Sequence, residues 1–143
     1  NEPHIPLKAY KNMNAYKLFV LDVGLLGAMS ELPAESILEG NDIFVEFKGA
    51  LTEQYVLQQI ISDTKYTPYY YGTEKATFEQ DFMIQMGKDV VPIEVKAETN
   101  LKSQSLKCYC EKYHPQKAIR FSAKKYIDQG WMKNVPLYAV CTL

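Results

Sequence analysis

Two acidic residues and a lysine lie in neighbouring segments that favour β-structure: Asp81 in the first, Glu94 and Lys96 in the second. Because alternate side chains of a strand share a face, Glu94 and Lys96 point the same way and the valine between them points the other. Two carboxylates about 5 Å apart at their Cβ atoms repel each other unless a cation or a proton lies between them. Magnesium favours one or two carboxylates completed by water and phosphate oxygens. We therefore predict a Mg²⁺ site at Asp81 and Glu94, with Lys96 placed to orient a water or stabilise charge on a phosphate.

The turn between the two segments decides whether the two acids meet. Gly87-Lys88 suits a two-residue type II′ turn, which has glycine at its first central position and pairs Met86 with Asp89. Continuing this register places Asp81 opposite Glu94.

A third acid, Glu53, lies in the longest predicted helix. This helix is predicted from Asn41 or Asp42, either of which can cap it, because apolar residues recur from there at helical spacing. Gly49 costs about 1 kcal/mol relative to alanine in mid-helix, so it predicts the close approach of another backbone. A carboxylate on a mostly apolar face needs a partner. We expect Glu53 to hold a metal-bound water or a second ion as an accessory catalytic group.

The remaining elements follow from periodicity and turn residues. Tyr16 to Leu21 is predicted as a short strand, and Asp22 as the cap of a helical turn from Val23 to Met29. Further on we predict strands at 67–71, 78–86 and 90–96, a helix at 103–113 that ends before His114-Pro115, and a strand at 117–121. The tail is predicted to add a helical turn and a closing strand that includes Leu137 to Val140. The order from residue 41 is α-β-β-β-α-β, an α/β sandwich with a mixed sheet flanked by helices.

Length and composition bound the class of protein. A chain of 143 residues with 47% hydrophobic and 23% charged side chains fits one globular domain. We assign residues 1–40 to a linker with an N-terminal strand and turn, and residues 41–143 to the domain itself. Its apolar stretches are too short to cross a bilayer. Three sparse cysteines favour a reducing compartment, so we expect a cytoplasmic protein. The start at Asn1, without a methionine, suggests a piece of a longer protein.

Charge is distributed unevenly along the chain. Residues 1–95 hold 7 basic and 14 acidic side chains, whereas residues 96–143 hold 9 basic and 3 acidic ones. The surplus consists of Lys102, Lys107, Lys112, Lys117, Lys124, Lys125 and Lys133. These lysines either line a surface that faces phosphates or form an ordinary solvated surface, and the sequence leaves both interpretations open.

Asp81, followed after a short hairpin by Glu94-Val95-Lys96 and framed by a helix that carries Glu53, resembles the core of the PD-(D/E)XK nuclease superfamily. More narrowly, the chain looks like a domain of unknown function found C-terminal to the P-loop domain of bacterial and archaeal AAA-type ATPases. The segments that carry this resemblance are Lys17-Leu18-Phe19-Val20-Leu21-Asp22-Val23-Gly24-Leu25-Leu26, Gly49-Ala50-Leu51-Thr52-Glu53, Glu79-Gln80-Asp81-Phe82 and Pro92-Ile93-Glu94-Val95-Lys96. They cover roughly residues 16–125.

This resemblance implies a restriction-endonuclease-like fold in which Asp81 and Glu94 bind the metal and Lys96 is the catalytic lysine. It also implies an ATPase domain upstream. The present chain has no Gly-x-x-x-x-Gly-Lys-Ser/Thr, so ATP would bind in that upstream domain. Gln80 departs from the pattern, since the superfamily name implies proline before the aspartate. Ala97 departs as well, since nuclease relatives often carry a polar residue after the lysine.

Two classes of function remain open. The chain is either a nucleic-acid-binding, nuclease-like domain with Mg²⁺-dependent phosphodiester hydrolysis, or a non-catalytic module that links the parent ATPase to a protein partner or to its own oligomer. The same residues also allow simpler, purely structural roles. The hairpin acids could face solvent in cross-strand ion pairs, and Glu53 or Glu79 could pair with Lys96. Tyr69-Tyr70-Tyr71 could stack on bases or pack at an edge strand.

Overall fold

The computed structural model describes residues 3–33, 35, 45–72, 79–97 and 102–143. The predicted cap of the long helix at Asn41 or Asp42 lies outside these residues. In chain order the elements are η1 (Leu7–Ala9), α1 (Val23–Met29), α3 (Val45–Asp63), β1 (Tyr69–Gly72), β2 (Glu79–Met86), β3 (Asp89–Lys96), α4 (Gln104–Tyr113), β4 (Ile119–Ser122), β5 (Ile127–Asp128), β6 (Lys133–Pro136) and η3 (Leu137–Thr142).

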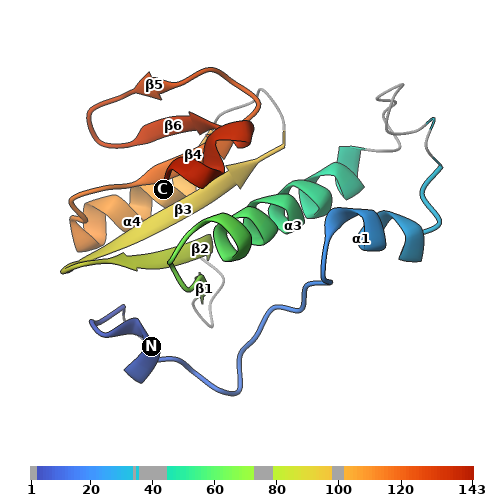
Figure 1. The fold of residues 1–143 in the computed structure, drawn as a ribbon. Coiled ribbons are helices and arrows are strands. Elements are labelled where there is room, and N and C mark those ends of the chain that lie inside the picture. Colours follow the sequence, from blue (N-terminus) through green and yellow to red (C-terminus); the bar gives the residue numbers. More distant parts are fainter. Residues whose placement is uncertain (1–2, 34, 36–44, 73–78, 98–101) are drawn as a thin grey trace.

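The six strands form one mixed sheet in the order β1-β2-β3-β4-β6-β5. Strands β1, β2 and β3 are antiparallel neighbours, β4 runs parallel to both β3 and β6, and β5 is antiparallel to β6. Helix α4 makes the crossover from β3 to β4. Helix α3 packs on one face of the sheet, and α4 contacts β2 and β3 from the other (Figure 1). The α/β class and the order α-β-β-β-α-β from the long helix onward are therefore confirmed.

The hairpin between β2 and β3 has the predicted register. Met86 pairs with Asp89, and the ladder continues to Phe82 opposite Ile93. Gly87 has a φ of +62°, while Lys88 does not have a positive φ, and a positive φ at the first central residue alone is the pattern of a type II′ turn. This turn sets which side chains of the two strands share a face.

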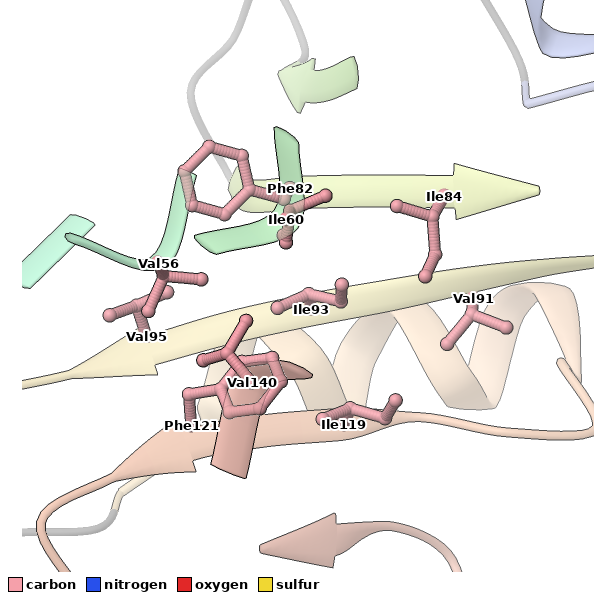
Figure 2. Packing of buried hydrophobic residues seen from close by; sticks show 10 residues of the cluster. All are labelled: Val56, Ile60, Phe82, Ile84, Val91, Ile93, Val95, Ile119, Phe121 and Val140. Carbon is pink, nitrogen blue, oxygen red and sulfur yellow. The ribbon is translucent and has the colours of Figure 1, made fainter. Parts of the chain in front are cut away.

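The main apolar core lies between the sheet and α3 (Figure 2). Alternate residues of β2, β3 and β4 point into it, and α3 contributes Val56 and Ile60, which lie four residues apart on one helix face. The buried members are Val56, Ile60, Phe82, Ile84, Val91, Ile93, Val95, Ile119, Phe121 and Val140. The alternation predicted for β2 and β3 is therefore the alternation that builds the core.

The predicted strand from Tyr16 to Leu21 is wrong. This segment is extended but belongs to no sheet, because a side chain of α3 satisfies its backbone instead of a neighbouring strand. The Val20 N–H donates to Gln54 Oε1 at 3.1 Å, and Gln54 Nε2 donates to the Val20 carbonyl at 2.9 Å. The next element is as predicted: α1 begins after Asp22, whose Oδ1 accepts from the Leu25 N–H at 2.8 Å.

Two further predictions are wrong. A methyl group on Gly49 would meet no atom within 4 Å among the described residues, so no backbone approaches there. The closing strand ends at Pro136, which has no N–H to extend the ladder, and Leu137 to Val140 lies in η3. The three-residue spacing of this helix lets Leu137 and Val140 both pack against the core.

The described part of the chain contains no helix that is both long enough and apolar enough to cross a membrane.

Candidate functional site

Glu94 lies in the centre of β3 on the face opposite the apolar core. It is only 6% exposed, and its neighbour in the parallel register is Arg120 of β4. Its Oε1 lies 2.9 Å from Lys96 Nζ, but its Oε2 is buried and has no hydrogen-bond partner among the described residues. A buried carboxylate oxygen without a donor costs free energy, and a cation at that oxygen would remove the cost. This burial excludes the interpretation of a solvent-facing hairpin for Glu94.

Asp81 lies in β2 one residue beyond the last pair of the ladder, Phe82 with Ile93, so the predicted pair of Asp81 with Glu94 is not part of that ladder. Its Oδ2 accepts from the Val95 N–H at 2.7 Å, so the carboxylate reaches the strand that carries Glu94. Burial raises the pKa of Asp81 to about 6, and the charges of Glu53 and Glu94 add to this effect, although the Val95 N–H opposes it. The pKa of Asp81 is therefore raised by the charges of both other predicted acids, Glu53 and Glu94.

The partner of Glu53 is Lys17, a residue that the sequence analysis did not select. Lys17 Nζ lies 3.6 Å from Glu53 Oε2 and 3.2 Å from Glu79 Oε1. Burial lowers the pKa of Lys17, but the nearby acids, including Asp81, outweigh burial and raise it above 10.5. The alternatives in which Glu53 or Glu79 pairs with Lys96 are wrong. The signal for Lys17 was present, because Glu53 on a mostly apolar helix face required a cation.

The three predicted acids do not form one compact metal-binding group. Across the residues that the structure describes, no set of three or more His, Cys, Asp or Glu side chains is arranged to hold a metal ion. Glu53 pairs with Lys17 and Glu94 Oε1 pairs with Lys96, which leaves Asp81 and Glu94 Oε2 without an ion pair among the described residues. Two carboxylates are sufficient for Mg²⁺, which takes its other ligands from water and phosphate oxygens. The oxygen donors and the unpartnered Glu94 Oε2 therefore fit a two-carboxylate site.

A second residue that the sequence analysis missed is Arg120, a fully buried side chain beside Glu94. Its Nε donates to Asn134 Oδ1 at 2.9 Å and its Nη1 to Ser103 Oγ at 3.1 Å, which joins β4 to β6 and to the start of α4. Ser122 Oγ donates to the same Asn134 oxygen at 2.8 Å. Burial lowers the pKa of Arg120, and Glu94 opposes that change. Arg120 is the only arginine of the chain and stands in a predicted strand, which was the available signal.

Two other features of the sequence were open to a binding role: the surplus lysines of residues 96–143 and the run Tyr69-Tyr70-Tyr71. The surplus lysines of residues 96–143 are all exposed, and two form surface ion pairs, Lys107 with Glu111 at 3.9 Å and Lys133 with Asp128 at 3.7 Å. In β1, Tyr71 is buried against Tyr109 and its hydroxyl lies 2.9 Å from that of Tyr113. Packing at the edge strand is therefore the role of Tyr71.

Comparisons with known proteins add one finding. A family model described as a domain of unknown function, DUF4143, matches residues 48–141. Searches of the curated proteins and of the solved structures found no match. The matched stretch begins within α3 and includes Glu53, Asp81, Glu94 and Lys96, whereas Lys17 precedes it. The chain belongs to the DUF4143 family, a domain of unknown function.

Proposed function

We propose that this domain binds nucleic acid and hydrolyses a phosphodiester bond with Mg²⁺ held by Asp81 and Glu94. The observation that carries the proposal is the buried Glu94 Oε2, which has no donor among the described residues and lies on the strand that Asp81 reaches through the Val95 N–H. A hard divalent cation satisfies such an oxygen and offsets the repulsion between the two carboxylates.

The side chains have distinct roles in this proposal. When bound, Mg²⁺ supplies Lewis acidity and neutralises charge on the phosphate. Lys96 is 33% exposed while its partner Glu94 is buried, so its ammonium group lies on the open side and can donate to a phosphate oxygen or orient a water. Glu53, held by Lys17, contributes negative charge next to Asp81. Arg120 is a positioning residue that fixes the polar face beneath Glu94.

The raised pKa of Asp81 gives the proposal a pH dependence. A proton and a cation compete for the same carboxylate. Because the pKa of Asp81 is about 6, metal binding and cleavage should increase as pH rises through 6 and become constant above about 7. The Asp81→Asn variant should show no such increase.

A cleavage assay tests the proposal. Plasmid and single-stranded substrates are incubated with wild type and with the Asp81→Asn and Lys96→Met variants, in Mg²⁺ and in EDTA. We expect cleavage by wild type in Mg²⁺ only, and a loss of about 100-fold or more in each variant. Asp63→Asn and Lys88→Met change exposed side chains outside the site and are the matched controls. Unchanged cleavage by Asp81→Asn would contradict the catalytic assignment.

A second candidate function rests on the N-terminal segment. Its apolar side chains are largely exposed, including Leu18 at 86% and Leu21 at 82%. Grouped apolar side chains on a surface are typical of protein interaction sites. We propose as the alternative that this segment docks on the ATPase domain of a parent chain, as the resemblance to AAA-type ATPases implies, or on a second copy. In that case the double variant Leu18→Ser, Leu21→Ser should no longer associate with the ATPase domain or with a second copy in sedimentation experiments. Asp81→Asn should associate as wild type does.

A further inference from the structure

A groove of about 990 Å³ lies between the N-terminal segment, the end of α3 and β1. Residues 8–19, which we call the arm, line one side of the groove. The residues on either side of the arm are held in place by packing and hydrogen bonds. On one side Leu7 is buried in the cluster with Tyr71 and Met83, and its N–H donates to Gln85 Oε1 at 3.1 Å. On the other side Val20 is bonded to the side chain of Gln54. Between these anchors the arm forms one wall of the groove.

The charge of the groove differs from that of the chain around it. Its lining includes Lys11, Lys17 and Lys65, and among the described residues that line it there is no aspartate or glutamate. Residues 1–95 contain 14 acidic and only 7 basic side chains, so three of those seven basic residues are gathered here. Lys11 and Lys65 form no ion pair with a described residue. A groove lined by unpaired lysines attracts a polyanion.

The rest of the lining is rich in aromatic rings. Besides the buried Tyr71, five tyrosines line the groove: Tyr10, Tyr16, Tyr66, Tyr69 and Tyr70. Two of them lie beside lysines of the groove, with Lys17 Nζ 5.7 Å from the ring centroid of Tyr70 and Lys65 Nζ 5.7 Å from that of Tyr66. Lysines and aromatic rings along one groove are the combination that binds unpaired nucleotides, because phosphates contact the amines while bases stack on the rings.

We propose that this groove binds a single strand of nucleic acid. Lys17 lines the groove and also pairs with Glu53, so the groove adjoins one of the predicted acids. The groove is proposed to bind a single strand whether or not that strand is cleaved. Only its description as the substrate rests on the proposed function. A protein segment, the other occupant of such a groove, would gain nothing from a lining whose charges are all positive unless it were acidic.

Binding is measured in EDTA by fluorescence anisotropy of a labelled oligo-dT strand and of a duplex of the same length. We expect the single strand to bind more tightly than the duplex, because bases must be unpaired to stack on tyrosine. With two phosphate contacts, at Lys11 and Lys65, the affinity should fall with salt at a logarithmic slope of about −1.4, at roughly 0.7 per contact. Lys11→Glu with Lys65→Glu should abolish most of this binding. Lys88→Glu with Lys117→Glu, the same charge change at exposed positions outside the groove, should leave a larger part of it.

The stacking contribution has its own matched pair. Tyr16 is 73% exposed and lines the groove, whereas Tyr138 is 80% exposed and lies outside it. Tyr16→Ala should weaken binding of the single strand by about fivefold or more, and Tyr138→Ala should not change it. Equal effects in both members of either pair, or no binding by wild type, would overturn the inference. If wild type binds the strand in EDTA but does not cleave it in Mg²⁺, the groove proposal stands and only the proposed function is contradicted.

Discussion

The two faces of β3 and β4 are equally buried but chemically opposite. On the face toward α3, Ile93 and Phe121 are packed among other apolar side chains (Figure 2). On the opposite face, Glu94 and Arg120 are just as inaccessible to solvent, yet they are charged. Burial of apolar groups supplies free energy of folding, whereas burial of charges costs free energy unless partners offset it. The comparison shows that the first face maintains the fold, whereas the second face costs part of the resulting stability.

The largest effect is expected on the apolar face. Phe121→Ala removes a fully buried ring and should lower the free energy of unfolding by about 3–5 kcal/mol. Ser122→Ala, the next residue of the same strand, loses a hydrogen bond to Asn134 and should cost only about 1 kcal/mol. Urea denaturation measures both values. Similar losses in the two variants would contradict the division of the strand into two chemically different faces.

A smaller loss is expected when the polar face loses its buried cation. Arg120→Met keeps the apolar part of the side chain but leaves Ser103 without its donor and Glu94 without a neighbouring charge. The free energy of unfolding should decrease by about 2–4 kcal/mol. Lys133→Met, which removes an exposed cation from an ion pair with Asp128, should cost less than about 1 kcal/mol. If Arg120→Met were as stable as wild type, the polar face would not depend on this network.

Asp81 should make the stability of the domain depend on pH. Its pKa in the folded state, about 6, is above the ordinary value, so the folded state binds the proton more tightly than the unfolded chain. The resulting stability is fully present below pH 4 and is lost as pH rises through 6. Asp81→Asn removes this loss and can still accept the Val95 N–H, so above pH 6 it should be more stable than wild type by at most about 3 kcal/mol. Thermal denaturation at pH 4.5 and 7.5 measures the change, and an equal difference between the two proteins at both values would contradict it.

The smallest effect concerns Gln80 of β2. Its side-chain amide is buried, and neither Oε1 nor Nε2 has a hydrogen-bond partner among the described residues. Gln80→Leu should therefore raise the free energy of unfolding by about 1 kcal/mol. Gln85→Leu in the same strand should have the opposite sign, because Gln85 accepts the Leu7 N–H and donates to the Gly87 carbonyl. A loss of stability in Gln80→Leu would show that this amide has a role which its contacts do not reveal.

Local patterns in the sequence predicted the parts of the molecule that depend on local rules. Alternation predicted which residues of β2 and β3 form the core, and Gly87-Lys88 predicted the turn that pairs Met86 with Asp89. The residues that complete the candidate site depend on contacts far apart in the chain. Lys17 reaches Glu53 across 36 positions, and Arg120 reaches Glu94 across 26, so no periodicity could indicate them. Tyr16 to Leu21 was predicted as a strand because its residues favour β-structure, whereas its backbone at Val20 is bonded by the side chain of Gln54.

A cation shared by Asp81 and Glu94 is the central requirement of the proposed function. Crystals of the domain soaked in Mn²⁺, with the ion located by its anomalous scattering, test this directly. The expected result is one bound ion in contact with a carboxylate oxygen of each residue, including Glu94 Oε2, and no ion there in crystals of Asp81→Asn. An empty site in wild type at saturating Mn²⁺ and pH 7.5, or an ion bound only elsewhere, would contradict it.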